Sequence, residues 1–564
     1  MTFTGTRSLN GELLSRREML GLSATTMLLG RAWGGICSRD RNWAETQLRR
    51  LSLAERVGQL MSVHNGIDGL WEGVRTGRAG SLQVPRGGET TARDVVEFNY
   101  EVQSQARVPL LTIGAVEAGM GQVAREATLL PNNMAIGATG SEELAYAAAQ
   151  VAAKEARALG IVWPGITVAD VNSNALNPII NTRSFGDSPD LVARLLVASI
   201  RAAQDQRLIS SANHFPGHGG TSQDSHLELP TVARSREELD RIDLPPFRAA
   251  IAAGVATMCT AHICYPALEP DVQRPATMSY AILTRLLRDE LGFEGFVHSD
   301  SFAMEAIRRN FSIAEAAVQS VRAGCDTILS YPDWDECHDA VLTTARKDDE
   351  LRLRVDESAR RLLMWKHWVG LIDAGPIDLE NCLAVLSNPD HKQTAAKIAR
   401  AAMTAVRGRE FLTSLSKREN VVCVVGRQRR PDESYATLLN LLKEQWSRAK
   451  LFELDVEPTD EQRRTLNDQA KDADAVVFLG FTEVRNHDPD SVRFPNRQVD
   501  VVQQLSQDVA LAVLCFGSPY AVEDFADANA VACAYDGIPV CLTAGVDALL
   551  GKQSWPGKLP VKLG

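Results

Sequence analysis

The first two thirds of the chain alternate short apolar and β-branched runs with longer amphipathic stretches. The stretches, such as EELAYAAAQVAAKEARALG and PDLVARLLVASIRAAQDQ, repeat apolar residues at i, i+3 and i+4, which is typical of helices that bury one face. Eight such strand–helix units within residues 43–375 predict an α/β fold, a TIM-type (β/α)8 barrel. A doubly wound parallel sheet produces the same alternation, so periodicity leaves both open. The predicted strands are residues 58–63, 79–84, 110–116, 165–171, 208–215, 256–263, 295–300 and 325–331.

A second set of strand-like runs follows residue 419. NVVCVVG, DAVVFLG, VALAVLCFG and AVACAY are apolar throughout, as expected of parallel strands buried on both faces. We therefore expect residues 420–564 to form a smaller α/β sandwich domain. Residues 376–419 are expected to be a linker with one helix over KQTAAKIARAAMTAVR, residues 392–407.

The N-terminus has the pattern of an export signal. Arg16 and Arg17 precede an apolar run from Met19 to Gly30, which is shorter than the ~20 residues that cross a bilayer. The pattern is similar to a twin-arginine signal peptide, so we expect residues 1–36 to direct export to the periplasm or the outside. The alternative to a signal peptide is that this segment forms an ordinary amphipathic N-terminal helix. No integral membrane segment is expected after signal removal.

Composition narrows the class of partner. The formal net charge is −11, and an acidic chain without clustered Lys and Arg argues against a nucleic-acid partner. The ten cysteines are scattered and lie mostly in apolar runs. We expect these cysteines to be small, buried side chains; the alternative is that some of them form one or two disulfides.

Polar residues gather after the predicted strands, where barrel enzymes carry their catalytic groups. The fifth strand leads into NHFPGHGGTSQDSH, which contains Asp224 and His226. An Asp two residues before a His can hydrogen-bond one imidazole nitrogen, which fixes the tautomer and leaves the other nitrogen for proton transfer. The alternative is that His226 is a loop residue whose bond to Asp224 is only structural. The seventh strand ends in Asp300, a position where an acid is costly unless it is hydrogen-bonded or catalytic, or caps the next helix.

Two further features of the sequence each have a plainer explanation. His214 and His218 have the i, i+4 spacing of metal-binding helices, but Pro216 and Gly217 interrupt such a helix, so no metal and no other cofactor is expected. Arg183 follows the fourth strand and offers five donors to hydroxyl or carbonyl groups. The alternative role for Arg183 is a structural salt bridge to one of two nearby acids, Asp187 or Asp190.

Together these motifs resemble glycoside hydrolase family 3, in particular its bacterial β-N-acetylglucosaminidase (β-N-acetylhexosaminidase) branch. NHFPGHG followed by DSH is similar to that branch's K-H-F-P-G-H-G and D-x-H segments. NPIINTRSFG is similar to N-P-x-I-x-x-R-S-F-G, and SDSFAM to S-D-x-x-x-M. The similarity extends from about residue 45 to residue 370 and continues more weakly in FGSPY and PGKLPV.

The resemblance implies an exo-acting, retaining enzyme that releases terminal β-linked N-acetylglucosamine through a covalent glycosyl-aspartate. It assigns the nucleophile to Asp300 and the acid/base to His226, with Asp224 as its partner in the catalytic group, so the second domain need not supply the acid. The expected partner is a carbohydrate from peptidoglycan or chitin. The implied substrate-binding positions are Arg183, His214, Asn213, Glu117 and Met304.

Two positions depart from the family pattern. Asn213 stands where the family has a lysine, and Ala115 stands where it has an aspartate that grips a distal hydroxyl. Both departures bear on sugar binding rather than on the nucleophile or the acid/base. They leave open a family 3 β-glucosidase or β-xylosidase, and a catalytically weak sugar-binding homologue.

Overall fold

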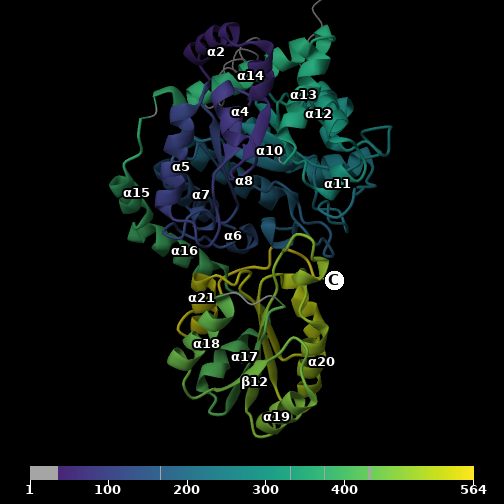
Figure 1. Cartoon of the computed structure of the whole chain (residues 1–564). Helices are drawn as coiled ribbons and strands as arrows, with labels where there is room; N and C mark the ends of the chain where they lie inside the picture. Colours follow the sequence, from purple (N-terminus) through teal and green to yellow (C-terminus); the bar gives the residue numbers. More distant parts are fainter. Residues whose placement is uncertain (1–35, 166, 331, 374, 430–432, 564) are drawn as a thin grey trace, which may run out of the picture.

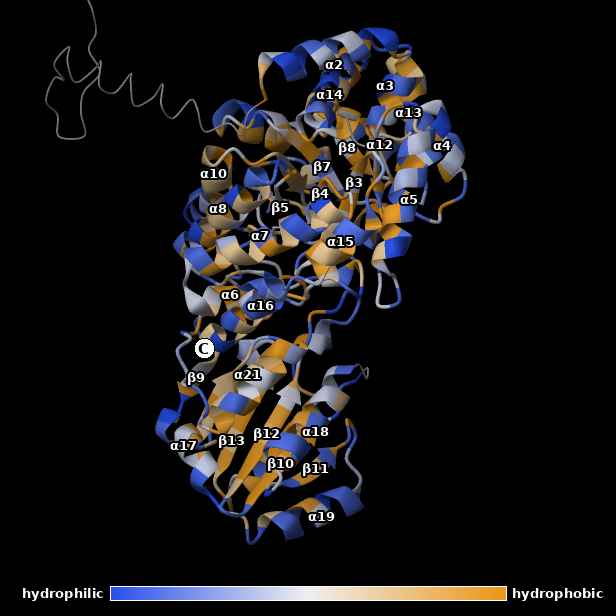
Figure 2. Ribbon diagram, turned by 90° about the vertical axis from the view of Figure 1, so that its left-hand side faces the viewer, coloured by the Kyte–Doolittle hydropathy of each residue, from blue (hydrophilic) through white to orange (hydrophobic). Residues whose placement is uncertain are grey.

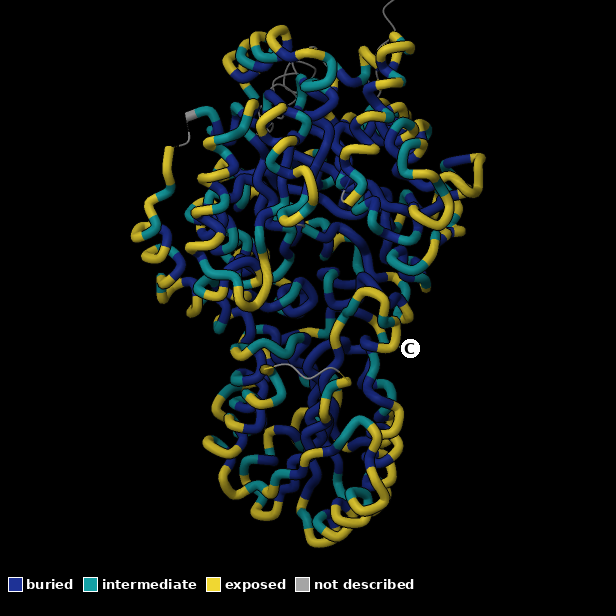
Figure 3. The backbone as a smooth tube through the Cα atoms, in the orientation of Figure 1, coloured by how far each residue is buried: buried dark blue, intermediate teal, exposed yellow. Residues whose placement is uncertain are grey.

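The computed structural model describes residues 36–563, apart from residues 166, 331, 374 and 430–432. These residues form two sheets, each covered by its own helices. Figure 1 shows the larger, N-terminal body stacked on the smaller, C-terminal one. Both bodies have a buried interior and an exposed rim, as Figure 3 shows along the backbone.

The first sheet is a barrel of eight parallel strands. Its order is β4-β3-β2-β1-β8-β7-β6-β5, and a parallel bridge from Val168 to Asn213 joins the two ends. Here the Ala169 amide donates to the Asn213 carbonyl at 2.6 Å. This arrangement confirms the TIM-type barrel and excludes the doubly wound sheet. The strands are β1 (Met61–His64), β2 (Ser81–Gln83), β3 (Leu111–Val116), β4 (Trp163–Gly165), β5 (Ser211–Phe215), β6 (Thr257–Thr260), β7 (Phe296–Ser301) and β8 (Thr327–Leu329).

The barrel helices follow the amphipathic stretches of the sequence. The two helices α7 (Glu142–Ala158) and α8 (Pro189–Asp205) show why: a serine caps each N-terminus and one apolar face of each is buried. The others are α2 (Ser38–Arg50), α3 (Leu53–Gln59), α4 (Leu70–Thr76), α5 (Ala92–Gln105), α6 (Asn133–Thr139), α9 (Arg236–Glu238), α10 (Leu244–Ala252), α11 (Glu305–Arg308), α12 (Ile313–Ala323), α13 (Trp334–Ala345) and α14 (Asp349–Trp368). Short 3₁₀ or π segments are η1 (Met120–Gln122), η2 (Asn181–Arg183), η3 (Leu239–Asp243), η4 (Ala276–Met278), η5 (Ala281–Glu290) and η6 (Leu371–Asp373).

The second sheet has the order β11-β10-β12-β13-β14-β9. Apolar residues fill both of its faces, which Figure 2 shows as orange central strands between amphipathic helices. This confirms the smaller α/β sandwich domain. Its strands are β9 (Thr404–Arg407), β10 (Val421–Gly426), β11 (Lys450–Leu454), β12 (Ala475–Phe481), β13 (Leu511–Phe516) and β14 (Ala530–Cys533). Its helical segments are α17 (Arg409–Ser414), η7 (Leu415–Lys417), α18 (Glu433–Gln445), α19 (Asp460–Ala470), η8 (Pro489–Val492), α20 (Asn496–Leu505), η9 (Pro519–Phe525) and α21 (Pro539–Leu549).

The segment before this domain differs from the sequence prediction. The helix predicted over residues 392–407 ends at Ala402, because the chain then enters β9. This strand pairs antiparallel with β14 and forms one edge of the second sheet. The structure therefore places residues 404–407 in the sheet that the sequence pattern begins at residue 420. The connection from the barrel contains α15 (Leu379–Leu386) and α16 (Pro389–Ala402).

The two bodies meet at the carboxyl end of the barrel strands. The Asn132 amide donates to the Asp536 carboxylate at 2.9 Å, and the Asn172 side chain donates to the Tyr520 hydroxyl at 3.0 Å. Both contacts join a loop at this end of the barrel to a segment that follows a strand of the second sheet. The second domain therefore covers the end of the barrel where polar residues gather.

Three other expectations concern the whole chain. The predicted signal peptide lies, apart from Ile36, outside the described residues. Within the described residues, no helix combines the length and the apolar character that crossing a bilayer requires. The cysteines are free thiols, and all of them except Cys37 are buried.

A buried lysine lies on the inner face of α14. The Lys366 side chain has no exposed surface, and its Nζ donates to Gln59 Oε1 at 2.6 Å. Burial lowers the pKa of Lys366 to about 7, because the ammonium loses its hydration. The charged form is therefore unfavourable in the folded protein.

We predict that Lys366→Met stabilises the protein, and by more at pH 7 than at pH 9. The pKa is depressed in the folded state, so the wild type loses stability as pH falls toward 7. The difference in unfolding free energy between the variant and the wild type should shrink by roughly 2 kcal/mol between pH 7 and pH 9. Urea unfolding of both proteins at each pH measures this difference. Lys397→Met, at a largely exposed lysine, is the control, and a gap that does not change with pH would contradict the prediction.

Candidate active site

A cavity of about 770 Å³ opens between the carboxyl end of the barrel and the second domain. Five of the residues predicted from the sequence line it: Glu117, Arg183, His214, His226 and Asp300. They lie in or directly after four different barrel strands, and the parallel direction of the strands brings them together.

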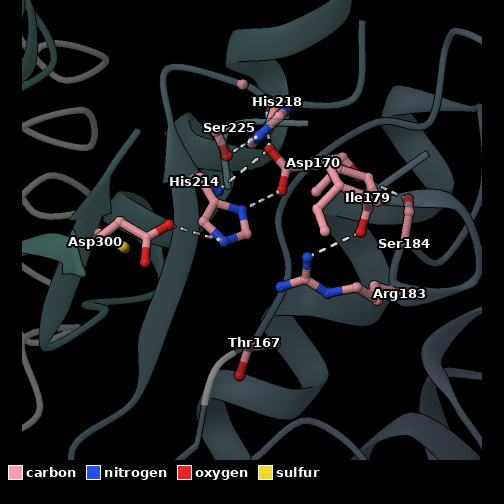
Figure 4. A network of polar contacts seen from close by, with 12 residues as sticks. Thr167, Asp170, Ile179, Arg183, Ser184, His214, His218, Ser225 and Asp300 are labelled. Atoms are coloured by element: carbon pink, nitrogen blue, oxygen red, sulfur yellow. Dashed lines mark hydrogen bonds and ion pairs between the residues drawn. The ribbon is translucent and has the colours of Figure 1, made fainter. Parts of the chain in front are cut away.

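A buried carboxylate organises the inner end of this cavity. Asp170 has no exposed surface and accepts the backbone amides of His214 at 3.2 Å and His218 at 2.6 Å. Its other oxygen lies 2.7 Å from His214 Nδ1. In Figure 4 the His214 ring lies between Asp170 and Asp300, with Arg183 beside it. Asp170 therefore fixes both the loop after β5 and the orientation of the His214 ring.

The two histidines of this loop have pKa values shifted in opposite directions. Burial opposes protonation of His214, but the charge and the hydrogen bond of Asp170, together with the charge of Asp300, outweigh burial and raise the pKa. Burial and the positive charge of His214 lower the pKa of His218 to about 4. The His218 ring nitrogens lie 3.0 Å from Thr221 Oγ1 and 3.0 Å from Ser225 Oγ. His214 is thus the more easily protonated of the two, and His218 is a neutral support for the loop.

Asp300 is the penultimate residue of β7 and faces His214. Its Oδ1 accepts the Ser301 amide at 2.7 Å, and its Oδ2 lies 4.0 Å from His214 Nε2. Burial alone would raise the pKa of Asp300, but His214, His262 and His226 outweigh that effect and lower it to about 2. The carboxylate does not cap the next helix, which begins after Met304 without a side-chain cap. Asp300 is an ionised carboxylate with 26% of its side chain exposed.

Asp224 and His226 form a hydrogen-bonded pair at the cavity wall. Asp224 Oδ1 accepts the His226 amide at 2.8 Å and lies 2.8 Å from His226 Nδ1. Burial would raise the pKa of Asp224, but the hydrogen bonds from His226 and their Coulomb attraction lower it to about 2. The ionised carboxylate holds the proton on Nδ1, so Nε2 is free for a ligand.

Arg183 is paired with Glu117 rather than with Asp187 or Asp190. Its Nε and Nη2 donate to the Glu117 carboxylate at 3.0 and 2.6 Å, and its Nη1 donates to the Ile179 carbonyl at 2.9 Å. This bidentate pair raises the Arg183 pKa despite burial. Both side chains remain about one fifth exposed toward the cavity.

Two predicted binding residues do not line the cavity. Asn213 is buried in the strand that closes the barrel, where its backbone bonds to Thr167 and Ala169. Met304 is 4% exposed and lies at the start of α11. The position that departs from the family pattern, Ala115, does line the cavity, and its carbonyl accepts a hydrogen bond from the exposed Arg86.

Sequence reasoning missed the central carboxylate and the second domain's contribution. An acid inside the apolar run GITVADV was the available signal for Asp170, because a buried carboxylate needs several donors. The cavity wall from the second domain had no such signal, because its residues are far away in sequence. That wall includes Phe481, Glu483, Tyr535 and Asp536.

The barrel fold and the polar side chains that line its cavity define the class of protein, a carbohydrate-processing enzyme. The profile described as the N-terminal domain of glycosyl hydrolase family 3 matches residues 52–364. The chain therefore belongs to glycosyl hydrolase family 3.

Named relatives show which branch of the family the chain resembles. It is 35% identical over 379 residues to a beta-N-acetylglucosaminidase/beta-glucosidase of Cellulomonas fimi, covering 65% of this chain and 66% of that one. It is 36% identical over 331 residues to beta-hexosaminidase A of Pseudoalteromonas piscicida, covering 54% of each. The match thus spans between about half and just under two thirds of these two curated relatives.

A solved structure covers more of the chain. A family 3 beta-N-acetylglucosaminidase from Paenibacillus sp. str. FPU-7 superposes with a TM-score of 0.80 at 32% identity, covering 91% of this chain and 99% of that one. The similarity therefore includes the second domain as well as the barrel.

We predict that Asp170→Asn destabilises the protein and lowers the His214 pKa. An amide cannot accept all three donors that meet Asp170, so one stays unpaired, which costs about 1–3 kcal/mol. Urea unfolding measures the first effect and histidine NMR titration the second. Asp289→Asn, at an exposed acid, is the control. Equal stability of both variants would show that Asp170 is not the organising group.

Proposed function

We propose that this chain is an exo-acting, retaining glycoside hydrolase that releases terminal β-linked N-acetylglucosamine. One observation carries the proposal: an ionised carboxylate, Asp300, and a carboxylate-oriented imidazole, His226, line one cavity. Retaining glycosidases need a nucleophile and a proton donor on the same glycosidic bond. The similarity to beta-N-acetylglucosaminidases and beta-hexosaminidases supports the choice of sugar.

The mechanism has two steps. In the first, Asp300 attacks the anomeric carbon while His226, in its imidazolium form, gives its Nε2 proton to the leaving oxygen, which takes the electron pair of the broken bond; His226 is left as the neutral Nδ1–H tautomer. In the second, His226 removes a proton from water as the water oxygen displaces Asp300. Configuration is retained because the anomeric centre is inverted twice.

The remaining polar groups hold the sugar. The Arg183 guanidinium, fixed by Glu117, and the His214 ring, whose pKa is raised, present donors to hydroxyl or carbonyl oxygens. The ionised state of Asp300 persists to about pH 2, so a loss of activity between pH 4 and pH 6 would come from another group. Fragments of peptidoglycan or chitin are the proposed substrates, which fits the export pattern of residues 1–36.

Side-by-side assays with chromogenic substrates test the reaction and the sugar. We expect turnover of the β-N-acetylglucosaminide above the β-glucoside and β-xyloside, and a loss of at least about 10³-fold in Asp300→Ala, because no nucleophile remains. Asp289→Ala is the surface control. Turnover that persists in Asp300→Ala contradicts the nucleophile assignment. Turnover of only the glucoside or xyloside contradicts the proposed sugar, and sugar binding without turnover indicates a binding protein.

The role of His226 has a separate signature. His226→Ala should lose about 10²–10⁴-fold in kcat/KM on a phenyl glycoside, whose leaving group needs protonation. The loss on a 2,4-dinitrophenyl glycoside should be far smaller, since that phenolate leaves unaided. Equal losses on both substrates would exclude His226 as the proton donor.

A further inference from the structure

A turn of the second domain reaches the Asp224–His226 pair. The His487 amide donates to Asp224 Oδ2 at 3.0 Å, while Oδ1 of the same carboxylate serves His226. The His487 and His226 rings meet edge to face, with centroids 5.5 Å apart. The second domain thus supplies a donor to the oxygen of Asp224 that His226 leaves free. Figure 1 shows its loops against the end of the barrel.

The shape of the turn explains why this amide is available. The Asp488 amide donates to the Arg485 carbonyl at 3.2 Å, which closes a four-residue turn. His487, the third residue, has a φ of 66°, which favours glycine in such turns. A side chain that occupies this left-handed conformation is costly and is found preferentially at functional positions. The hydrogen bond that closes the turn is donated by the amide of its fourth residue, Asp488. The His487 amide takes no part in that bond and donates to Asp224 instead.

A serine fixes the turn in place. Ser491 Oγ accepts the Arg485 amide at 3.1 Å and donates to the Asp488 carbonyl at 2.6 Å. The Ser491 carbonyl accepts the Glu483 amide at 2.9 Å. The Arg485 side chain forms an ion pair with Glu483. The His487 amide is therefore held by a preformed loop, which docks against Asp224 without further ordering.

The contact has a direct consequence for proton transfer. Asp224 is 3% exposed, and a buried carboxylate rotates or takes up a proton when one of its oxygens lacks a donor. With both oxygens bonded, the carboxylate stays ionised and is held beside the His226 ring. That keeps the proton on Nδ1 and directs Nε2 to the cavity.

We propose that His487 is a positioning residue for the acid/base. Its amide holds Asp224, so the docked second domain sets the tautomer and orientation of His226. The acid His226 and its partner Asp224 belong to the barrel, but the second domain donates the hydrogen bond that holds Asp224. This inference rests on the proposed glycosidase function and adds that the acid is assembled across the two domains.

The test compares His487→Pro with His487→Gly in the full-length chain. Proline lacks the amide hydrogen and does not adopt a φ of 66°, whereas glycine keeps the donor and suits the turn. In His487→Pro we expect kcat/KM to fall at least about 30-fold on phenyl β-N-acetylglucosaminide and less than about 5-fold on the dinitrophenyl substrate. His487→Gly should keep the wild-type ratio between the two substrates.

A readout that needs no turnover separates this inference from the proposed function. In ¹⁵N spectra of histidine-labelled protein, assigned with His226→Gln, wild-type His226 should be the Nδ1–H tautomer. His487→Pro should populate the Nε2–H form. If the wild type cleaves no glycoside but the tautomer shifts, the function fails and the positioning role stands.

A second variant guards against misfolding of the proline variant. Ser491→Ala loosens the turn without touching Asp224 and should change the substrate ratio in the same direction, by a smaller factor. Lys471→Ala, at an exposed residue of the same domain, is the control. An unchanged substrate ratio and an unchanged His226 tautomer in both His487→Pro and Ser491→Ala would overturn the proposal.

Discussion

The parallel direction of all eight barrel strands is the constraint on which the rest of the structure depends. Parallel strands place their carboxyl ends together, so polar residues at those ends lie close to one another. Asp170 follows β4, His214 lies in β5 and Asp300 lies in β7, and the three meet within one hydrogen-bond and ion-pair network. Antiparallel neighbours would point alternate strand ends in opposite directions.

Two carboxylates then determine how charge is distributed at that end. Asp170 and Asp224 are buried, and each accepts two backbone amides as well as an imidazole hydrogen bond. In a poorly hydrated site such carboxylates keep neighbouring histidines in one orientation and one tautomer. His214 is held beside Asp300 with a raised pKa, and His226 is held in the orientation that the proposed proton transfer requires. Two chemically identical side chains thereby take different roles.

The second domain is part of this arrangement rather than an appendage. Its strand ends supply the far wall of the cavity, and the turn that contains His487 completes the hydrogen bonding of Asp224. The contacts at Asn132 and Asn172 dock it at several separate places. Since the cavity is bounded from both sides, a sugar would be enclosed between two domains whose covalent connection runs through α15 and α16.

The sequence by itself determined the elements. The apolar periodicity located seven of the eight barrel strands and four strands of the second sheet, and the ordered motifs indicated Asp300, Asp224 and His226, because these signals are local. The fourth barrel strand was placed too late, since residues 165–171 were predicted and β4 is Trp163–Gly165. Local signals did not separate α16 from β9, since a short apolar run suits either structure. Only the tertiary structure decided that Asp170 lies at the centre, that Arg183 pairs with Glu117, and that His487 touches Asp224. Those contacts join residues between 44 and 263 positions apart, and such pairings are set by chain packing, which no local pattern records.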